Sequence, residues 1–241
     1  MKNSICIATY NGENYIEAQL RSILNQINTD DEVIIVDDCS IDNTVKVVCE
    51  IQDERIKLVT NQFNQGISKT FEKALGIANG DIVFLSDQDD VWFKNKVSVI
   101  TELFKNDIDI IQHDVVIVDA NMTPIYDSFF KLRNAGSGII KNYISNTYLG
   151  CSMALRRKVI SSCLPIIEHS GYHDRWIGIT AELKGYKVLF TNEKLMYYIR
   201  HQGTGSNLKR RSLLKILFDR IEFLKAIFIF YLKKIWSGRI N

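Results

Sequence analysis

The sequence is short of the residues that mark secreted, zinc-binding or membrane-spanning chains. Its 241 residues include two prolines and five cysteines, and no two cysteines have the spacing of a zinc knuckle or a redox pair. The cysteines are therefore expected to be free thiols in a reducing compartment. No run reaches the roughly 18 apolar residues of a membrane-spanning helix, and Met1 to Tyr10 lacks the apolar core of a signal peptide. These absences favour a cytoplasmic location.

The two common phosphate-binding loops are also missing. The chain contains no Gly-x-x-x-x-Gly-Lys-Ser/Thr sequence, and no Gly-x-Gly-x-x-Gly sequence follows its first strand. A phosphate group would therefore have to be bound through a metal ion and individual side chains.

Strand-like and helix-like segments alternate along the first half of the chain. Strands are predicted at 4–9, 32–36, 56–60 and 81–85, and helices at 44–51, 68–79 and 94–105. A further helix is predicted to start at a capping box formed by Asn14 and Glu17. This alternation predicts a Rossmann-like α/β fold, with a mostly parallel sheet and helices on both faces.

The most informative segment is Ser-Asp-Gln-Asp-Asp at 86–90, directly after the apolar run 82–85. Asp87, Asp89 and Asp90 repel one another unless a cation lies between them. Ligation by carboxylate oxygens is typical of Mg²⁺ or Mn²⁺. The alternative is a solvated acidic loop without a metal.

Polar clusters follow two other predicted strands, at 9–13 and 37–40. Ligands of open α/β sheets bind at the carboxyl ends of the strands, so these clusters are expected to meet the acidic segment at one edge. Thr9 and Tyr10 could hold a nucleotide base, and Asp38 could accept a hydrogen bond from a base or ribose. The alternative for Asp38 is a role in a turn or helix cap.

The order of these motifs resembles the family 2 glycosyltransferases of the GT-A fold. The matching segments are 4–12, 34–44, 64–66 and 80–90, followed by Tyr-His-Asp-Arg-Trp at 172–176 and Tyr-Ile-Arg-His-Gln-Gly at 198–203. The forms at 86–92 and 173–176 resemble the branch that contains bacterial rhamnosyltransferases and other surface-polysaccharide enzymes. The resemblance implies a domain over 1–207, with a nucleotide-binding half at 1–107 and an acceptor half at 108–207.

The resemblance also implies roles for individual residues. Asp174 matches the catalytic base of an inverting displacement, with a helix cap as its alternative. The metal site would contain Asp89, Asp87 and His201, and the alternative for His201 is a solvated loop residue. The nucleotide pocket would be lined by Thr9, Tyr10, Asn11, Glu13, Asp38, Gly66, Lys69 and Asp87, and the acceptor site by Gly150, Cys151, His173 and Trp176.

One residue departs from the family pattern. Lys69 stands where many members have Arg or Asn, so the base, uridine or thymidine, stays open.

The segment 208–241 is strongly basic, with nine basic and two acidic residues against a net charge of +2 for the whole chain. It is predicted to form one helix over 208–236 with an apolar stripe of Leu213, Leu217, Ile221, Leu224, Phe228, Tyr231 and Ile235. Such a helix suits an anionic membrane surface. The alternative is packing on the domain or on a second subunit in a homodimer. No nucleic-acid-binding motif accompanies the basic charge.

The predicted function is therefore transfer of a sugar, rhamnose being one candidate, from a UDP- or dTDP-sugar to a glycan or lipid-linked acceptor, in the synthesis of capsule, O-antigen or a similar polysaccharide. One alternative is a nucleotidyltransferase that makes the sugar nucleotide. That enzyme needs a Gly-rich basic loop after the first strand, which residues 9–13 do not offer. The other alternative is a catalytically inactive module that binds sugar nucleotides.

Overall fold

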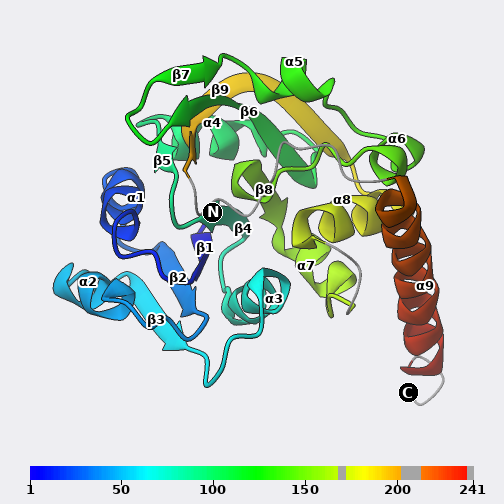
Figure 1. Cartoon of the computed structure of the whole chain (residues 1–241), viewed down its shortest axis with the longest axis horizontal. Helices are drawn as coiled ribbons and strands as arrows, with labels where there is room; N and C mark the ends of the chain where they lie inside the picture. Colours follow the sequence, from blue (N-terminus) through cyan, green and yellow to red (C-terminus); the bar gives the residue numbers. More distant parts are fainter. Residues whose placement is uncertain (168–171, 202–212, 238–241) are drawn as a thin grey trace.

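A computed structural model of the chain describes residues 1–167, 172–201 and 213–237. One large sheet runs through the described part, with helices around it (Figure 1). Its strands are β1 (Asn3–Thr9), β2 (Glu32–Asp37), β3 (Ile56–Thr60), β4 (Ile82–Asp87), β5 (Val91–Trp92), β6 (Ile110–Asp119), β7 (Pro124–Tyr126), β8 (Met153–Arg156) and β9 (Val188–Arg200). Their order is β3-β2-β1-β4-β8-β6-β9-β5, with β7 paired to β6.

The helices connect and flank these strands. They are α1 (Ile16–Leu24), α2 (Thr44–Glu50), α3 (Ile67–Ile77), α4 (Lys96–Leu103), α5 (Phe129–Arg133), α6 (Ile139–Ile144), α7 (Arg157–Cys163), α8 (His173–Leu183) and α9 (Leu213–Ser237), with a short 3₁₀ turn, η1 (Gly150–Ser152). The expected α/β architecture, with a mostly parallel sheet, is confirmed.

Side-chain alternation in the central strands produces two hydrophobic cores. In β1, Ile5 and Ile7 pack with Leu20 of α1 on one face of the sheet. Cys6 points to the opposite face and packs with Phe71 of α3. Because both faces are covered, these strands are buried along most of their length and read as continuous apolar runs.

The parallel strands β3, β2, β1 and β4 align their carboxyl ends. Thr9 of β1 pairs with Asp37 of β2, and Ala8 pairs with Asp87 of β4. The three polar clusters therefore meet at one edge of the sheet, as the sequence predicts. β8 runs antiparallel to both β4 and β6, and it connects the two halves of the sheet. The boundary predicted between the halves, at residue 107, stays a prediction.

Helix α1 begins differently from the prediction. Its first residue is Ile16, and the residue before it, Tyr15, forms no side-chain cap. Glu17 pairs with Arg21 one turn later, at 2.7 Å. The predicted capping box of Asn14 and Glu17 is therefore wrong, because Glu17 finds its partner along the helix rather than at its start.

Helix α9 has two apolar faces, where the sequence predicted one. Phe223, Ala226 and Phe230 are buried, and the rings of Phe223 and Phe230 stand edge-on to Trp176 of α8 at centroid distances of 6.1 and 5.2 Å. Four members of the predicted stripe, Leu217, Ile221, Leu224 and Phe228, are exposed, whereas Tyr231 packs partly against the same core. Packing on the domain and an exposed apolar stripe are thus both present.

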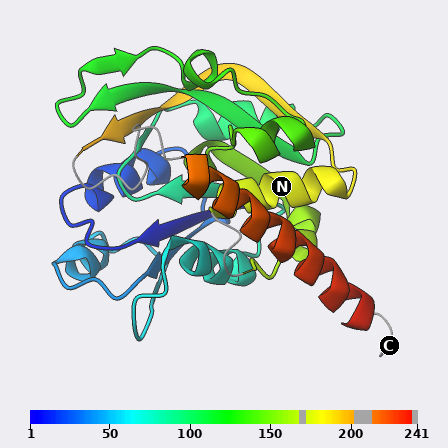
Figure 2. The ribbon, with the colours of Figure 1, turned by 45° about the vertical axis from the view of Figure 1, so that its right-hand side comes forward.

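Figure 1 shows α9 beside α6 and α8, and Figure 2 shows its C-terminal end extending beyond the rest of the fold. Of the helices in the described part of the chain, none is long and apolar enough to cross a membrane. The basic residues at 209–211 and the stretch 202–207 lie outside the described residues.

The two faces of α9 should differ sharply in their contribution to stability. We expect Phe223→Ala to lower the free energy of unfolding by about 3–5 kcal/mol, because it leaves a cavity against Trp176. Phe228→Ala is the matched control on the exposed face and should change it by less than about 0.5 kcal/mol. Urea denaturation measures both values. Equal losses for the two variants would contradict the packing of Phe223 against Trp176.

Candidate active site

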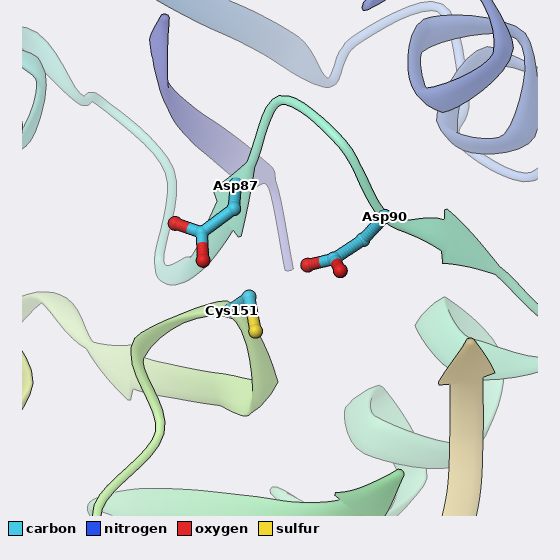
Figure 3. A group of neighbouring side chains, drawn as sticks. All are labelled: Asp87, Asp90 and Cys151. Atoms are coloured by element: carbon cyan, nitrogen blue, oxygen red, sulfur yellow. The ribbon is translucent and has the colours of Figure 1, made fainter. Parts of the chain in front are cut away.

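The acidic segment forms the turn between β4 and β5, and its side chains point in different directions. Asp90 is 1% exposed and faces the interior. Oxygen atoms of Asp87 and Asp90 and the sulfur of Cys151 all lie within 4.8 Å of one another. Figure 3 shows these three side chains gathered where β4 turns toward β5, with Cys151 on η1. The turn therefore presents Asp90 to the core, while 14% of the Asp89 side chain stays exposed.

Burial and repulsion raise the pKa values of two of these carboxyl groups. Burial, with the charges of Asp89 and Asp174 added, raises the pKa of Asp87 to about 7. Burial also raises the pKa of Asp90 well above its usual range, and Asp89 and Asp87 add to the effect. The site thus carries an excess of negative charge that a cation would relieve.

His201 reaches the acidic turn from the end of β9. Its Nε2 lies 2.7 Å from Oδ2 of Asp89, and its ring stacks on Tyr15 with the centroids 4.3 Å apart. The two side chains are only 12% and 14% exposed. The structure therefore brings together two of the three residues that the resemblance assigns to a metal.

A magnesium or manganese ion fits the Asp89 end of the turn better than the Cys151 end. Burial raises the pKa of the Cys151 thiol well above its usual range, so the sulfur keeps its proton. Lys96 already places an amino group near Asp90 and Asp87. Mg²⁺ and Mn²⁺ prefer carboxylate oxygen ligands to a protonated thiol. Asp89, His201 and Asp87 are thus the residues suited to the ion.

Gln88 joins the acidic turn to the loop after β1. Its Oε1 accepts hydrogen bonds from Oγ1 of Thr9 at 2.5 Å and from the backbone N–H of Tyr10 at 2.9 Å, and its Nε2 donates to the Tyr10 carbonyl at 3.2 Å. A Cβ atom on Gly12 would lie 2.3 Å from Oε1 of Gln88, so glycine leaves room for this contact. Gln88 was not among the residues predicted for the site, because its partners Thr9 and Tyr10 lie 79 and 78 residues away in the sequence.

Asn11 and Glu13 hold the loop after β1 against the loop after β2. Oδ1 of Asn11 accepts from the Ile41 N–H at 2.9 Å, and Oε2 of Glu13 accepts from the backbone and side chain of Asn43 at 2.9 and 2.8 Å. Both residues therefore lie at the strand edge where the nucleotide pocket is expected. Their contact with a nucleotide stays a prediction.

Asp38 organises the turn that starts α3. It is 3% exposed, and its carboxylate accepts from the side chain of Asn61 and from the N–H groups of Gln65 and Gly66, each at 2.8 Å. This is the turn role that the sequence left as its alternative, and a role toward a nucleotide stays a prediction. Gly66 precedes α3 with a φ of +84°, a conformation that glycine adopts most easily.

Lys69 makes contacts on the side of α3 that faces the segment after α7. Its Nζ donates to Oε2 of Glu72 at 3.0 Å and to the carbonyl of Ile166 at 3.1 Å. The N–H of Ile166 donates to the same Glu72 carboxylate at 2.8 Å. The pair thus fixes a segment that leads toward Asp174, and its nucleotide contact stays a prediction.

Asp174 lies in the first turn of α8 and faces the acidic motif. Burial raises its pKa to about 6, against hydrogen bonds from the backbone of Arg175 and Gly150 that lower it. It is close enough to Asp87 for its charge to raise the pKa of that group. The candidate base and the acidic turn therefore lie close to one another.

The four residues assigned to the acceptor are interior residues in the structure. His173 stacks on Phe71 with ring centroids 4.1 Å apart, and burial lowers its pKa to about 3. A Cβ atom on Gly150 would lie 2.4 Å from Nε2 of His173. Trp176 and Cys151 are fully buried, and Nε1 of Trp176 donates to the Cys163 carbonyl at 2.8 Å. These residues support η1 and α8, and contact with an acceptor stays a prediction.

Comparison with known proteins places these features in a family. The family model described as Glycosyl transferase family 2 matches residues 4–164. The chain is 33% identical over 154 residues to the Escherichia coli UDP-Glc:alpha-D-GlcNAc-diphosphoundecaprenol beta-1,3-glucosyltransferase WfgD, covering 61% of each chain. It is 28% identical to the dTDP-rhamnosyl transferase RfbG of Shigella flexneri, over 88% of this chain and 78% of the relative.

A solved structure shares the fold. The crystal structure of S. aureus TarS 1-349 in complex with UDP-GlcNAc matches with a TM-score of 0.69 and 23% identity, over 92% of this chain and 66% of that chain. The likeness confirms the expected GT-A fold. The chain spans less than two thirds of the length of TarS 1-349 and of the glucosyltransferase.

Gln88 should matter for the affinity of a nucleoside diphosphate. We expect Gln88→Ala to weaken binding of UDP or dTDP in the presence of Mn²⁺ by roughly tenfold, since it removes the hydrogen bonds that fix Thr9 and Tyr10. Gln88→Glu keeps the acceptor oxygens but loses the donor to Tyr10, so its effect should be similar or larger beside Asp87 and Asp89. Isothermal titration calorimetry measures both. Unchanged dissociation constants in folded variants would show that the bridge has no role in binding.

Proposed function

The chain belongs to glycosyl transferase family 2, and on this basis we propose that it transfers a sugar from a UDP- or dTDP-sugar to a hydroxyl group of a glycan or lipid-linked acceptor, with inversion at the sugar. The observation that carries the proposal is the position of Asp174, a carboxyl with a pKa raised to about 6, opposite the acidic turn at 87–90. The names of the relatives support a place in polysaccharide synthesis, since one is a glucosyltransferase acting on a diphosphoundecaprenol-linked sugar and another a dTDP-rhamnosyl transferase.

The reaction is a single displacement at the anomeric carbon. A bond forms between the acceptor oxygen and C1 of the sugar, while the bond between C1 and the diphosphate oxygen breaks. Asp174 takes the proton of the acceptor hydroxyl. A carboxylate with a pKa near 6 is ionised at neutral pH and is a stronger base than an exposed aspartate, which suits this step.

The leaving diphosphate needs positive charge at the other end of the site. Asp87, Asp89 and His201 would hold a Mg²⁺ or Mn²⁺ ion, and the bound ion would neutralise the charge of the departing diphosphate. Gln88 supports the nucleotide end, because it fixes the loop that carries Thr9 and Tyr10. Asp174 would thus remove the proton at one end of the site, and the residues of the acidic turn with His201 would stabilise the leaving group at the other end.

Replacing the base should abolish transfer without loss of the fold. We expect Asp174→Asn to lower kcat by about 10²–10⁴-fold, because the amide cannot accept the proton. The measurement is release of UDP, dTDP or GDP from a panel of sugar nucleotides, with Mn²⁺ and acceptor glycans. Glu193→Gln, an exposed carboxylate on β9, is the control and should retain full activity. Normal turnover in folded Asp174→Asn would overturn the assignment of the base.

The same carboxyl predicts the direction of the pH dependence. Its pKa is raised to about 6, so the ionised fraction falls as the pH drops through 6, and kcat should fall about tenfold per unit below that value. The profile of Asp174→Asn should be flat in this range. A wild-type protein that turns over none of the donors would favour the inactive binding module instead.

We further propose that the exposed face of α9 contacts an anionic membrane surface, where a lipid-linked acceptor would lie. Seven large apolar side chains on this helix are at least 42% exposed: Leu217, Phe218, Ile221, Leu224, Phe228, Ile229 and Leu232. Lys215, Lys225 and Lys233 are exposed on the same helix. An apolar stripe accompanied by lysines is the pattern of helices that lie in the headgroup region.

Membrane contact should depend on this stripe and on lipid charge. We expect the protein to float with phosphatidylglycerol vesicles and far less with phosphatidylcholine vesicles, because the lysines bind anionic headgroups. Leu224→Glu with Phe228→Glu should reduce flotation at least tenfold without unfolding the protein, since both residues are exposed. If flotation is unchanged while light scattering shows the same variant converting a dimer to a monomer, the face is a subunit interface and the membrane proposal is wrong.

A further inference from the structure

Lys96 is a buried lysine that the proposed reaction does not use. It is the first residue of α4 and is 1% exposed. Its Nζ donates to the carbonyl of Cys151 at 3.0 Å, lies 3.4 Å from the sulfur of Met196, and sits 3.9 Å from the centre of the Trp92 ring. One amino group therefore contacts β5, η1 and β9 at the same time.

The same amino group lies next to the interior side of the acidic turn. Asp90 is 1% exposed, and no N–H group in the described segments donates to its carboxylate oxygens. The buried Asp90 carboxyl group therefore anchors this turn in the core, and the Lys96 amino group lies on the same interior side.

The contact with Cys151 reaches the other end of the site. Cys151 is the middle residue of η1, between Gly150 and Ser152. The backbone of Gly150 forms a hydrogen bond with the Asp174 carboxyl. Lys96 therefore contacts the turn that bears Asp174's partner, and through the Trp92 ring it contacts β5, which directly follows the turn that carries Asp89.

We propose that Lys96 is a positioning residue that sets the spacing between the metal-binding carboxylate Asp89 and the base Asp174. It does so from the interior of the protein, by holding η1 against the end of the acidic turn. This inference rests on the proposed function, since Asp89 and Asp174 take their roles from it. A displacement of about 1 Å between reacting groups can lower a rate by about 10²-fold. Loss of Lys96 should therefore act on the rate of the chemical step, although it touches neither donor nor acceptor.

The test compares Lys96→Met with wild type in the full chain. Methionine preserves length and apolar packing but removes both the charge and the hydrogen-bond donor. We expect kcat to fall between 10- and 100-fold, while KM for the donor changes less than threefold. Affinity for Mn²⁺, measured by calorimetry without donor, should stay equal or rise, because the variant lacks the amino group that lies near Asp87 and Asp90. Lys94→Met, an exposed lysine two residues earlier, is the matched control and should keep wild-type values.

A double variant separates positioning from charge balance. Lys96→Met with Asp90→Asn removes both buried ionisable groups, so its melting temperature should return toward that of wild type. Its kcat should stay at least tenfold low, because the hydrogen bond to the Cys151 carbonyl is still missing. If Lys96→Met alone fails to fold, the double variant supplies the same measurement of kcat.

Two results would overturn the inference. One is a kcat within threefold of wild type in a folded variant that lacks Lys96. The other is recovery of kcat together with stability in the double variant, which would show that the lysine serves charge balance alone. An inactive wild-type protein would instead count against the proposed function.

Discussion

Repulsion among three carboxylates on one short turn is the constraint around which this site is built. Asp87, Asp89 and Asp90 are too close in sequence for all three to ionise freely without compensating charge. The fold separates them by direction: Asp90 points inward toward Lys96, and Asp89 points outward to His201. Asp87 lies between them and faces Asp174. A single acidic motif thus becomes a structural anchor on one side and a cation site on the other.

The sheet brings the acidic turn next to the other loops of the candidate site. Parallel pairing of β1 with both β2 and β4 places the ends of the three strands side by side, so the loops after them share one edge. β8 then joins β4 in the antiparallel direction, and the turn before β8, η1, lies beneath the acidic motif. Asp174 follows on α8. The nucleotide side and the base side are therefore contributed by different parts of the chain but share one rigid sheet.

Local patterns in the sequence predict much of this arrangement. The strand at 56–60 is observed with the predicted bounds, because β-rich runs between polar turns are recognisable without tertiary information. Gln88 and Lys96 could not be recognised in the same way, since their partners lie 78 and 55 residues away. The packing face of α9 was missed for a related reason: Phe223 and Phe230 are apolar neighbours of an equally apolar stripe, and it is their packing against distant residues such as Trp176 that distinguishes the two faces.

The contact between α9 and Trp176 has a consequence for how the tail can be studied. Trp176 lies two residues after Asp174 in the same helix, and the rings of α9 form part of its covering. Deleting the tail would expose the Trp176 indole to water, on the same helix that carries the candidate base. A truncated protein would then lose activity through a weakened interior, whatever the tail binds, so point changes on the outer stripe are the way to separate anchoring from catalysis.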